Sequence, residues 1–269
     1  GEFGVALREG IATDFENREK IAARLRFASS HAAGPDALVS LDDYLGRMRE
    51  GQKQIYFLGG PDRTAIEGSP NLEVFRRRNL EVLFLPDPID EFVLSTLHAY
   101  KDKPLVSIDS ADVELPEATE KDAEAAEPES GKSEPTPSGF GRVLTLFREA
   151  LREQVEDVRE SQRLTDSPCC LVNPKGAAST QMQKLLHATH QDFPLAKRIF
   201  EVNPRHPLVR RLAELSANAD HEPFIAECGR QLFANALILE GLPLDTGEAT
   251  GRVERFMQEL AQKRSPIVT

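Results

Sequence analysis

The sequence SLDDYLGRMREGQKQIYFLGG, residues 40–60, is followed by SPNLEVFRRRNLEVLFLPDPIDEFVLSTLHAY, residues 69–100, and these two stretches decide the fold. They hold two strand-like apolar runs, Ile55–Leu58 and Glu81–Leu85, and a third run, Pro104–Ile108, follows. Helical patterns separate the runs. Apolar strands that alternate with helices are typical of a parallel sheet covered on both faces. The sequence therefore predicts a small three-layer αβα domain over residues 40–115.

A helix is predicted before this domain, near the start of the chain. Thr13 and Glu16 have the spacing of a capping box, which marks a helix N-terminus. Ile21, Leu25 and Ala28 then recur at i, i+4 and i+7, the period of one helix face. We therefore expect a helix that opens at Thr13 and includes these three residues.

The formal charge of −11 is concentrated in one segment. Residues 111–138 hold nine acidic residues and two lysines, so −7 of the total belongs to this stretch. Four prolines also fall there. Such a composition buries too little apolar surface to form a core. We expect residues 116–139 to be an acidic, proline-rich linker, and we do not interpret the charge as a binding face.

Residues 140–269 are predicted to form a second domain of mixed α+β type. Three short strands are expected, at Val155–Arg159, Cys169–Val172 and Arg198–Val202, with a helix over 178–190. Two final helices form an apolar hairpin, which needs another surface to cover it, and a second copy of the chain would supply one. The residues expected to contact that copy are Ile225, Cys228, Leu232, Leu239, Val253, Phe256, Met257 and Leu260.

The sequence has few features of an active site. The segment Gly59-Gly60-Pro61 follows a strand but lacks both common phosphate-loop patterns. His187 and His190 share a helix face without a third ligand at a telling spacing, and the adjacent cysteines of residues 169–170 point to opposite faces of a strand. We therefore predict no catalytic and no metal-binding residues.

Composition restricts the partners and the compartment. The chain has no Trp and no sustained basic stripe, which argues against nucleic acid. No apolar stretch reaches the length that spans a bilayer, so no membrane is expected. The three cysteines lack framework spacing, which favours a reducing, cytoplasmic compartment.

Five stretches, in order along the chain, resemble the heat-shock protein 90 chaperone family in its bacterial form, HtpG. They are FGVALREGIATDFENREKIAARLRFASS, SLDDYLGRMREGQKQIYFL, SPNLEVFRRRNLEVLFLPDPIDEF, DVRESQRLTDSPCCLV and IFEVNPRHPL. The resemblance covers nearly the whole chain except the linker, which is longer and richer in proline than the family pattern.

The resemblance implies that the chain is the later middle domain plus the C-terminal dimerisation domain of an ATP-dependent chaperone. Residues 1–39 would be the helical coil of the middle domain. ATP and Mg²⁺ would bind an N-terminal domain outside this chain, so no cofactor is expected here. The implied partners are unfolded or partly folded clients, a second copy, and bacterial cochaperones. Clients would bind in the cleft between the two domains, at Glu91, Phe92, Ser95, Met182, Leu185 and Leu186.

Two other hypotheses remain open at this point. The chain could be a nucleotide- or metabolite-binding α/β enzyme with its site at the ends of strands Ile55–Leu58 and Glu81–Leu85. It could instead be a dimerisation module without a client role. Binding of an unfolded protein distinguishes the chaperone from both, whereas tight binding of ATP or a cofactor would favour the enzyme.

Overall fold

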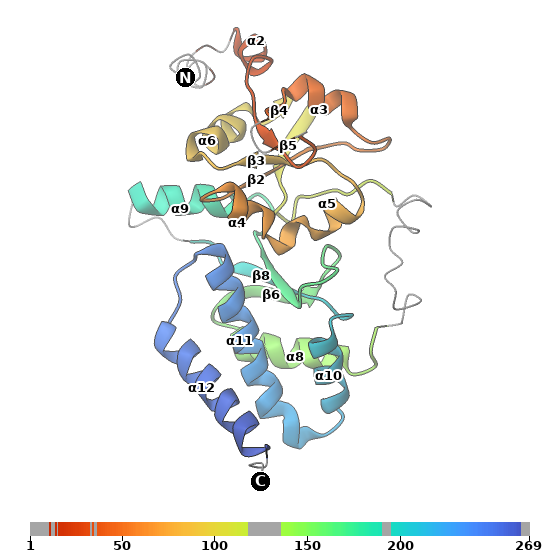
Figure 1. Ribbon diagram of the computed structural model, residues 1–269, viewed down its shortest axis with the longest axis vertical. Helices are drawn as coiled ribbons and strands as arrows, with labels where there is room; N and C mark the ends of the chain where they lie inside the picture. Colours follow the sequence, from red (N-terminus) through yellow and green to blue (C-terminus); the bar gives the residue numbers. More distant parts are fainter. Residues whose placement is uncertain are drawn as a thin grey trace, which may run out of the picture. The chain divides into compact units, whose positions relative to one another are not determined.

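The computed structural model describes residues 11, 14, 16–32, 34, 37–117, 136–189 and 195–264 (Figure 1). The structure is mixed α+β and contains two sheets. Contacts divide the chain into two compact units. The first unit comprises residues 1–134, 162–165 and 172–198, and the second comprises 135–161, 166–171 and 199–269. Most of the predicted linker lies outside the described residues.

The sheet of the first unit has five strands in the order β1-β3-β2-β5-β4. These strands are β1 Ala28–Ser29, β2 Ile55–Gly59, β3 Leu83–Leu85, β4 Ala99–Tyr100 and β5 Lys103–Ser107. The central strands β3, β2 and β5 are parallel, as predicted. The edge strands β1 and β4 are antiparallel to their neighbours, so the prediction of a purely parallel sheet is wrong.

The antiparallel edge has a local cause between β4 and β5. Lys101 and Asp102 both have positive φ, 46° and 64°, which is the backbone of a tight two-residue hairpin turn. Such a turn reverses the chain immediately, whereas a parallel connection needs a long crossover. The short strand β4 therefore pairs antiparallel with β5.

Both faces of this sheet are buried, and β2 shows why. Ile55 and Phe57 join a cluster that includes α3 and α6, while Tyr56 and Leu58 join a cluster that includes α4 and α5. Successive strand residues point to opposite faces, so an uninterrupted apolar strand can supply two cores. The helices of the first unit are α2 Arg18–Ala22, α3 Leu41–Arg47, α4 Arg63–Glu67, α5 Glu73–Arg77, α6 Pro88–Leu97 and α9 Thr180–Thr189, with a 3-10 turn, η1, at Pro70–Leu72.

The first described helix is shorter than predicted. α2 ends at Ala22, and Ala28 lies in β1, where it pairs with Phe84 of β3. Leu25 is buried in the core between them. The apolar spacing predicts one helix face, but sheet pairing overrides it, so the helical prediction is wrong beyond α2. Thr13, its expected cap, lies outside the described residues.

The second unit holds a three-stranded sheet in the order β6-β8-β7. Its elements are α8 Phe140–Leu151, β6 Val155–Glu160, β7 Cys169–Val172, β8 Arg198–Val202, α10 Pro207–Leu215, a 3-10 turn, η2, at Ala219–His221, α11 Glu222–Glu240 and α12 Thr246–Gln262. The bounds of β7 and β8 confirm the predicted strands. In the core, the Phe200 ring lies 6.2 Å from that of Phe147 and 5.7 Å from that of Phe233, measured between centroids.

Close packing between α8 and α11 depends on Gly229. A Cβ placed on this residue would lie 2.5 Å from a ring carbon of Phe147, whose side chain is fully buried. Gly251 of α12 differs, because a Cβ there would meet nothing within 4 Å. The same substitution should therefore have opposite effects at the two sites.

We predict that Gly229→Ala destabilises the chain by about 1–3 kcal/mol, because the added methyl group overpacks the core. Gly251→Ala should stabilise it by roughly 0.5–1 kcal/mol, because alanine is the better helix former at an open position. Denaturant unfolding followed by circular dichroism measures both. Equal effects of the two changes would contradict the packing argument.

Candidate functional site

Helix α6 is capped and anchored in the core, and it carries the exposed aromatic side chain of Phe92. Its N-cap is Asp87, whose carboxylate accepts a hydrogen bond from the Ile89 N–H at 3.1 Å, and Pro88 occupies the first turn. Val93 and Leu94 are buried in the core under the sheet. Phe92 faces outward and is 47% exposed, which is unusual for a large aromatic side chain.

Helix α9 packs against α6 within the first unit (Figure 1). Met182 is buried, whereas Leu185 and Leu186 are half-buried. Of the large apolar side chains on these two helices, Ile89 and Phe92 are the exposed ones. We call this surface, formed by Ile89, Phe92, Leu185 and Leu186, the α6–α9 surface.

A buried polar network holds the α9 segment to the first sheet. The Asn173 N–H donates to the Asp109 carbonyl at 2.7 Å, and the Thr180 N–H donates to the Asp109 carboxylate at 2.8 Å. The Gln183 amide donates to the Asn173 side-chain oxygen at 3.0 Å. Arg198 donates to the side chains of both Asn173 and Gln183. Hydrogen bonds among buried polar groups are strengthened by the low local dielectric, so this network ties the α9 segment to the sheet.

Glu91 lies beneath the α6–α9 surface and joins its two helices. Its side chain accepts a hydrogen bond from the Ser179 hydroxyl, which directly precedes α9. The residue is 1% exposed, and its Oε2 has no hydrogen-bond partner among the described residues. Burial, reinforced by the nearby Asp109 carboxylate, raises the pKa of Glu91 to about 7, although the Ser179 hydrogen bond opposes the shift.

Gly59 makes room for this carboxyl group. A Cβ on Gly59, at the carboxyl end of β2, would overlap the Glu91 carboxylate. Glycine is therefore required at this position by close approach and not by its backbone angles. The Glu91 carboxyl group is therefore packed between β2 and α6, where it has little access to water.

The six residues predicted to contact clients all lie in the first unit, on α6 or α9. Phe92 is exposed, and Ser95, Leu185 and Leu186 are half-buried. Glu91 and Met182 are buried, so they support the surface from below. Sequence analysis missed the exposed Ile89, although its i, i+3 spacing from Phe92 could have indicated it.

A second apolar surface lies on the last two helices of the second unit. Leu239 is 67% exposed and Met257 is 63% exposed. Val253, Met257 and Leu260 follow one face of α12 at i, i+4 and i+7. We call the five exposed residues the α11–α12 surface: Ile238, Leu239, Val253, Met257 and Leu260.

Other residues predicted to contact a second copy belong to the core of this chain. Ile225, Cys228 and Leu232 are buried against α8 and the sheet of the second unit. Phe256 packs against Phe224, with ring centroids 5.9 Å apart, and is partly buried. Their heptad-like spacing is thus explained by intrachain packing, and their part in dimerisation stays a prediction. Ile238 was missed in the sequence.

The described residues include no group of three or more His, Cys, Asp or Glu side chains that could hold a metal ion. His187 is exposed, and His190 lies outside the described residues. The Gly60 N–H donates to the Leu85 carbonyl at 3.2 Å, and Ile66 fills the space beside Gly60. The Gly60 N–H is therefore used in a hydrogen bond within the fold, at the position where a phosphate loop would direct its backbone N–H groups toward a ligand.

The described cysteines are poorly suited to act as nucleophiles. Burial raises the pKa of Cys169 to about 12 and that of Cys228 to about 11, so little reactive thiolate forms at neutral pH. None of the described helices is both long and apolar enough to cross a bilayer.

Comparison with known proteins defines the class. The family model described as Hsp90 protein matches residues 1–266, and the chain therefore belongs to the Hsp90 family. Its relatives include the Chaperone protein HtpG of Nitratidesulfovibrio vulgaris, 42% identical over 92% of this chain and 39% of that protein. The HtpG of Geobacter sulfurreducens is 42% identical over 90% of this chain and 36% of its own length. The HtpG of Chlorobium phaeovibrioides is 41% identical over 97% of this chain and 39% of its own length. The chain thus spans less than two fifths of these relatives.

The buried Glu91 predicts a specific pH dependence. Because its pKa is about 7 when folded and near 4.5 when unfolded, the folded state binds more protons in between. Stability contributed by the protonated group is present below 4.5 and is lost as the pH rises to 7. Relative to wild type, Glu91→Gln should therefore gain on the order of 3 kcal/mol in unfolding free energy between pH 5 and pH 8.

Denaturant unfolding across this pH range tests the prediction. Glu50→Gln, at an exposed position on the same unit, is the matched control and should show no such gain. Parallel pH profiles for wild type and Glu91→Gln would contradict the assignment.

Proposed function

We propose that this chain is the client-binding and dimerising part of an ATP-dependent Hsp90 chaperone. Unfolded or partly folded proteins would bind at the α6–α9 surface. Family membership supports the proposal, and the observation that carries it is the exposed Phe92 ring on a rigid base of buried contacts. Aromatic side chains dominate binding because they bury a large area at little cost in conformational entropy.

The composition of the surface suits clients of varied sequence. Its exposed part is apolar and carries few groups that would impose one hydrogen-bonding pattern on a ligand. Surfaces of this kind bind diverse partners by hydrophobic contact. ATP and Mg²⁺ would be bound by another part of the whole protein and would control this surface from there. Cochaperones and a cytoplasmic location also stay predictions.

The α11–α12 surface supports the proposal of a homodimer. Five large apolar side chains on two adjacent helices would be costly to leave in water. A second copy related by a two-fold axis would present the same surface, and four helices could then pack around one apolar interior.

We expect a labelled, permanently unfolded protein, such as reduced and carboxymethylated α-lactalbumin, to bind this chain saturably in fluorescence anisotropy. Phe92→Ala and Leu186→Ser should each weaken binding about tenfold, because each removes apolar contact area. Ile238→Ala removes an exposed apolar side chain from the other unit and should leave the affinity unchanged. Absence of binding, or binding indifferent to both changes, would overturn the client assignment and favour a dimerisation module.

Dimerisation is tested separately by sedimentation velocity at micromolar concentration. The chain should sediment at twice its single-chain mass of 29.9 kDa. Leu239→Ser combined with Met257→Ser should shift it to the single-chain mass, because polar groups replace the centre of the apolar contact. Leu38→Ser, at an exposed apolar position in the first unit, is the control. A wild-type chain at the single-chain mass would refute the homodimer.

A further inference from the structure

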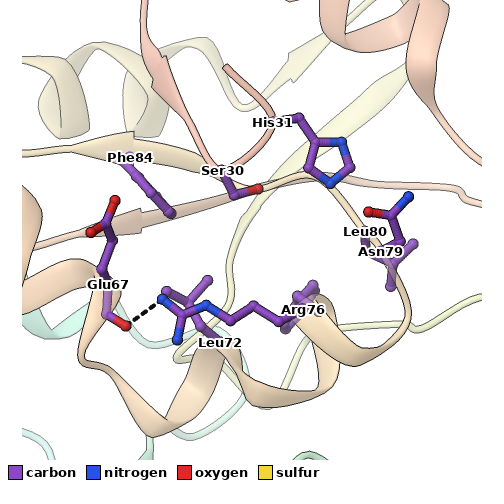
Figure 2. Close-up of a pocket in the computed structure, with 9 residues that line it drawn as sticks. Ser30, His31, Glu67, Leu72, Arg76, Asn79, Leu80 and Phe84 are labelled. Carbon is purple, nitrogen blue, oxygen red and sulfur yellow. Dashed lines mark hydrogen bonds between the residues drawn. The ribbon is translucent and has the colours of Figure 1, made fainter. Parts of the chain in front are cut away.

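A cavity of about 260 Å³ opens in the first unit, away from helices α6 and α9. Its lining comes from the loop after β1, from α4, η1 and α5, and from β3 (Figure 2). The lining residues are Ser30, His31, Glu67, Leu72, Phe75, Arg76, Asn79, Leu80 and Phe84. Nothing in the proposed chaperone function uses this cavity.

The cavity combines an apolar floor with a polar rim. Leu72, Phe75, Leu80 and Phe84 are buried and form the apolar part. The exposed rim supplies side chains that can donate hydrogen bonds. Ligand sites commonly have this composition, in which apolar walls bind the body of a ligand and a few polar groups orient it.

Arg76 is the positively charged group of this rim, and Glu67 is the negatively charged one. Its guanidinium donates to the Glu67 carbonyl, which holds the side chain extended across the opening (Figure 2). Arg76 forms no ion pair with a described residue, because the Glu67 carboxylate pairs with Arg63 at 2.7 Å. The guanidinium therefore keeps donors and a positive charge for a ligand.

His31 and Asn79 extend the set of donors. Both are exposed on the rim, and neither side chain forms a hydrogen bond with the described residues. Asn79 is also held at a positive φ of 49°, which fixes its place in the turn after α5. The rim thus offers one guanidinium, that of Arg76, beside a Glu67 carboxylate that pairs with Arg63, and a single guanidinium suits a monoanion better than a doubly charged phosphate.

We propose that this cavity binds a carboxylate attached to a single apolar side chain. The carboxylate would pair with Arg76, whose planar donors match its two oxygens, and the apolar group would lie against Phe75 and Leu80. The volume admits about one such group, since pockets for drug-sized ligands begin at roughly 300 Å³. The ligand can be a free amphipathic acid or the C-terminal residue of a peptide.

Isothermal titration calorimetry with three probes tests the proposal and distinguishes the two sources. The probes are N-acetyl-phenylalanine, a hexapeptide ending in Phe with a free carboxylate, and the same peptide as its C-terminal amide. We expect high-micromolar to millimolar affinity for at least one free carboxylate and at least tenfold weaker binding of the amide. Binding of the small acid would identify a metabolite-type site, whereas binding of the peptide alone would identify a site for chain ends.

Variants link the binding to the cavity. Arg76→Gln should weaken binding of the carboxylate at least tenfold, and Asn79→Gly, which tolerates the positive φ, should weaken it less. Arg77→Gln makes the same charge change on the same helix outside the lining and should have no effect. Circular dichroism checks that each variant is folded. No binding by any probe, equal binding of acid and amide, or indifference to Arg76→Gln would overturn the proposal.

Discussion

The place of α9 in the first unit depends on one pairing of backbone groups, between Asp109 and Asn173. The Asn173 N–H donates to the Asp109 carbonyl, and the Ala111 N–H donates to the Asn173 carbonyl, so two distant segments run side by side just after β5. This pairing returns residues 172–198 to the sheet of the first unit. The same pairing holds the segment that leads into α9, and α9 packs against α6. The α6–α9 surface is therefore built by two segments about ninety residues apart in sequence.

Local signals predict much of the fold. Strand β7 is a continuous apolar run, whereas β8 places Arg198 and Glu201 among its apolar residues, and both strands have the predicted bounds. The parallel core of the first sheet follows from alternating strands and helices. The edge strands could not be predicted in the same way, because two-residue pairings such as Ala28–Phe84 depend on distant partners. Family resemblance, and not physical pattern, led to the functional hypothesis.

The candidate site is less predictable because burial depends on tertiary packing. The family resemblance selected Phe92, but the burial of Glu91 on α6 depends on the close approach of Gly59 at the end of β2. The apolar spacing along α11 likewise does not show which of its residues pack into the core of the chain and which stay exposed. Its earlier part, at Ile225 and Leu232, packs into the core, and its end at Leu239 is exposed.

The burial of all three cysteines has a practical consequence for observing this chain at work. Cys169, Cys170 and Cys228 are largely shielded from solvent, and a maleimide reacts only with an accessible thiolate. A single cysteine introduced at an exposed position would therefore be the site that such a dye labels in the folded chain. Pairs of dyes could be attached without removing any native thiol, so movements of the two units could be followed by energy transfer in an otherwise unaltered sequence.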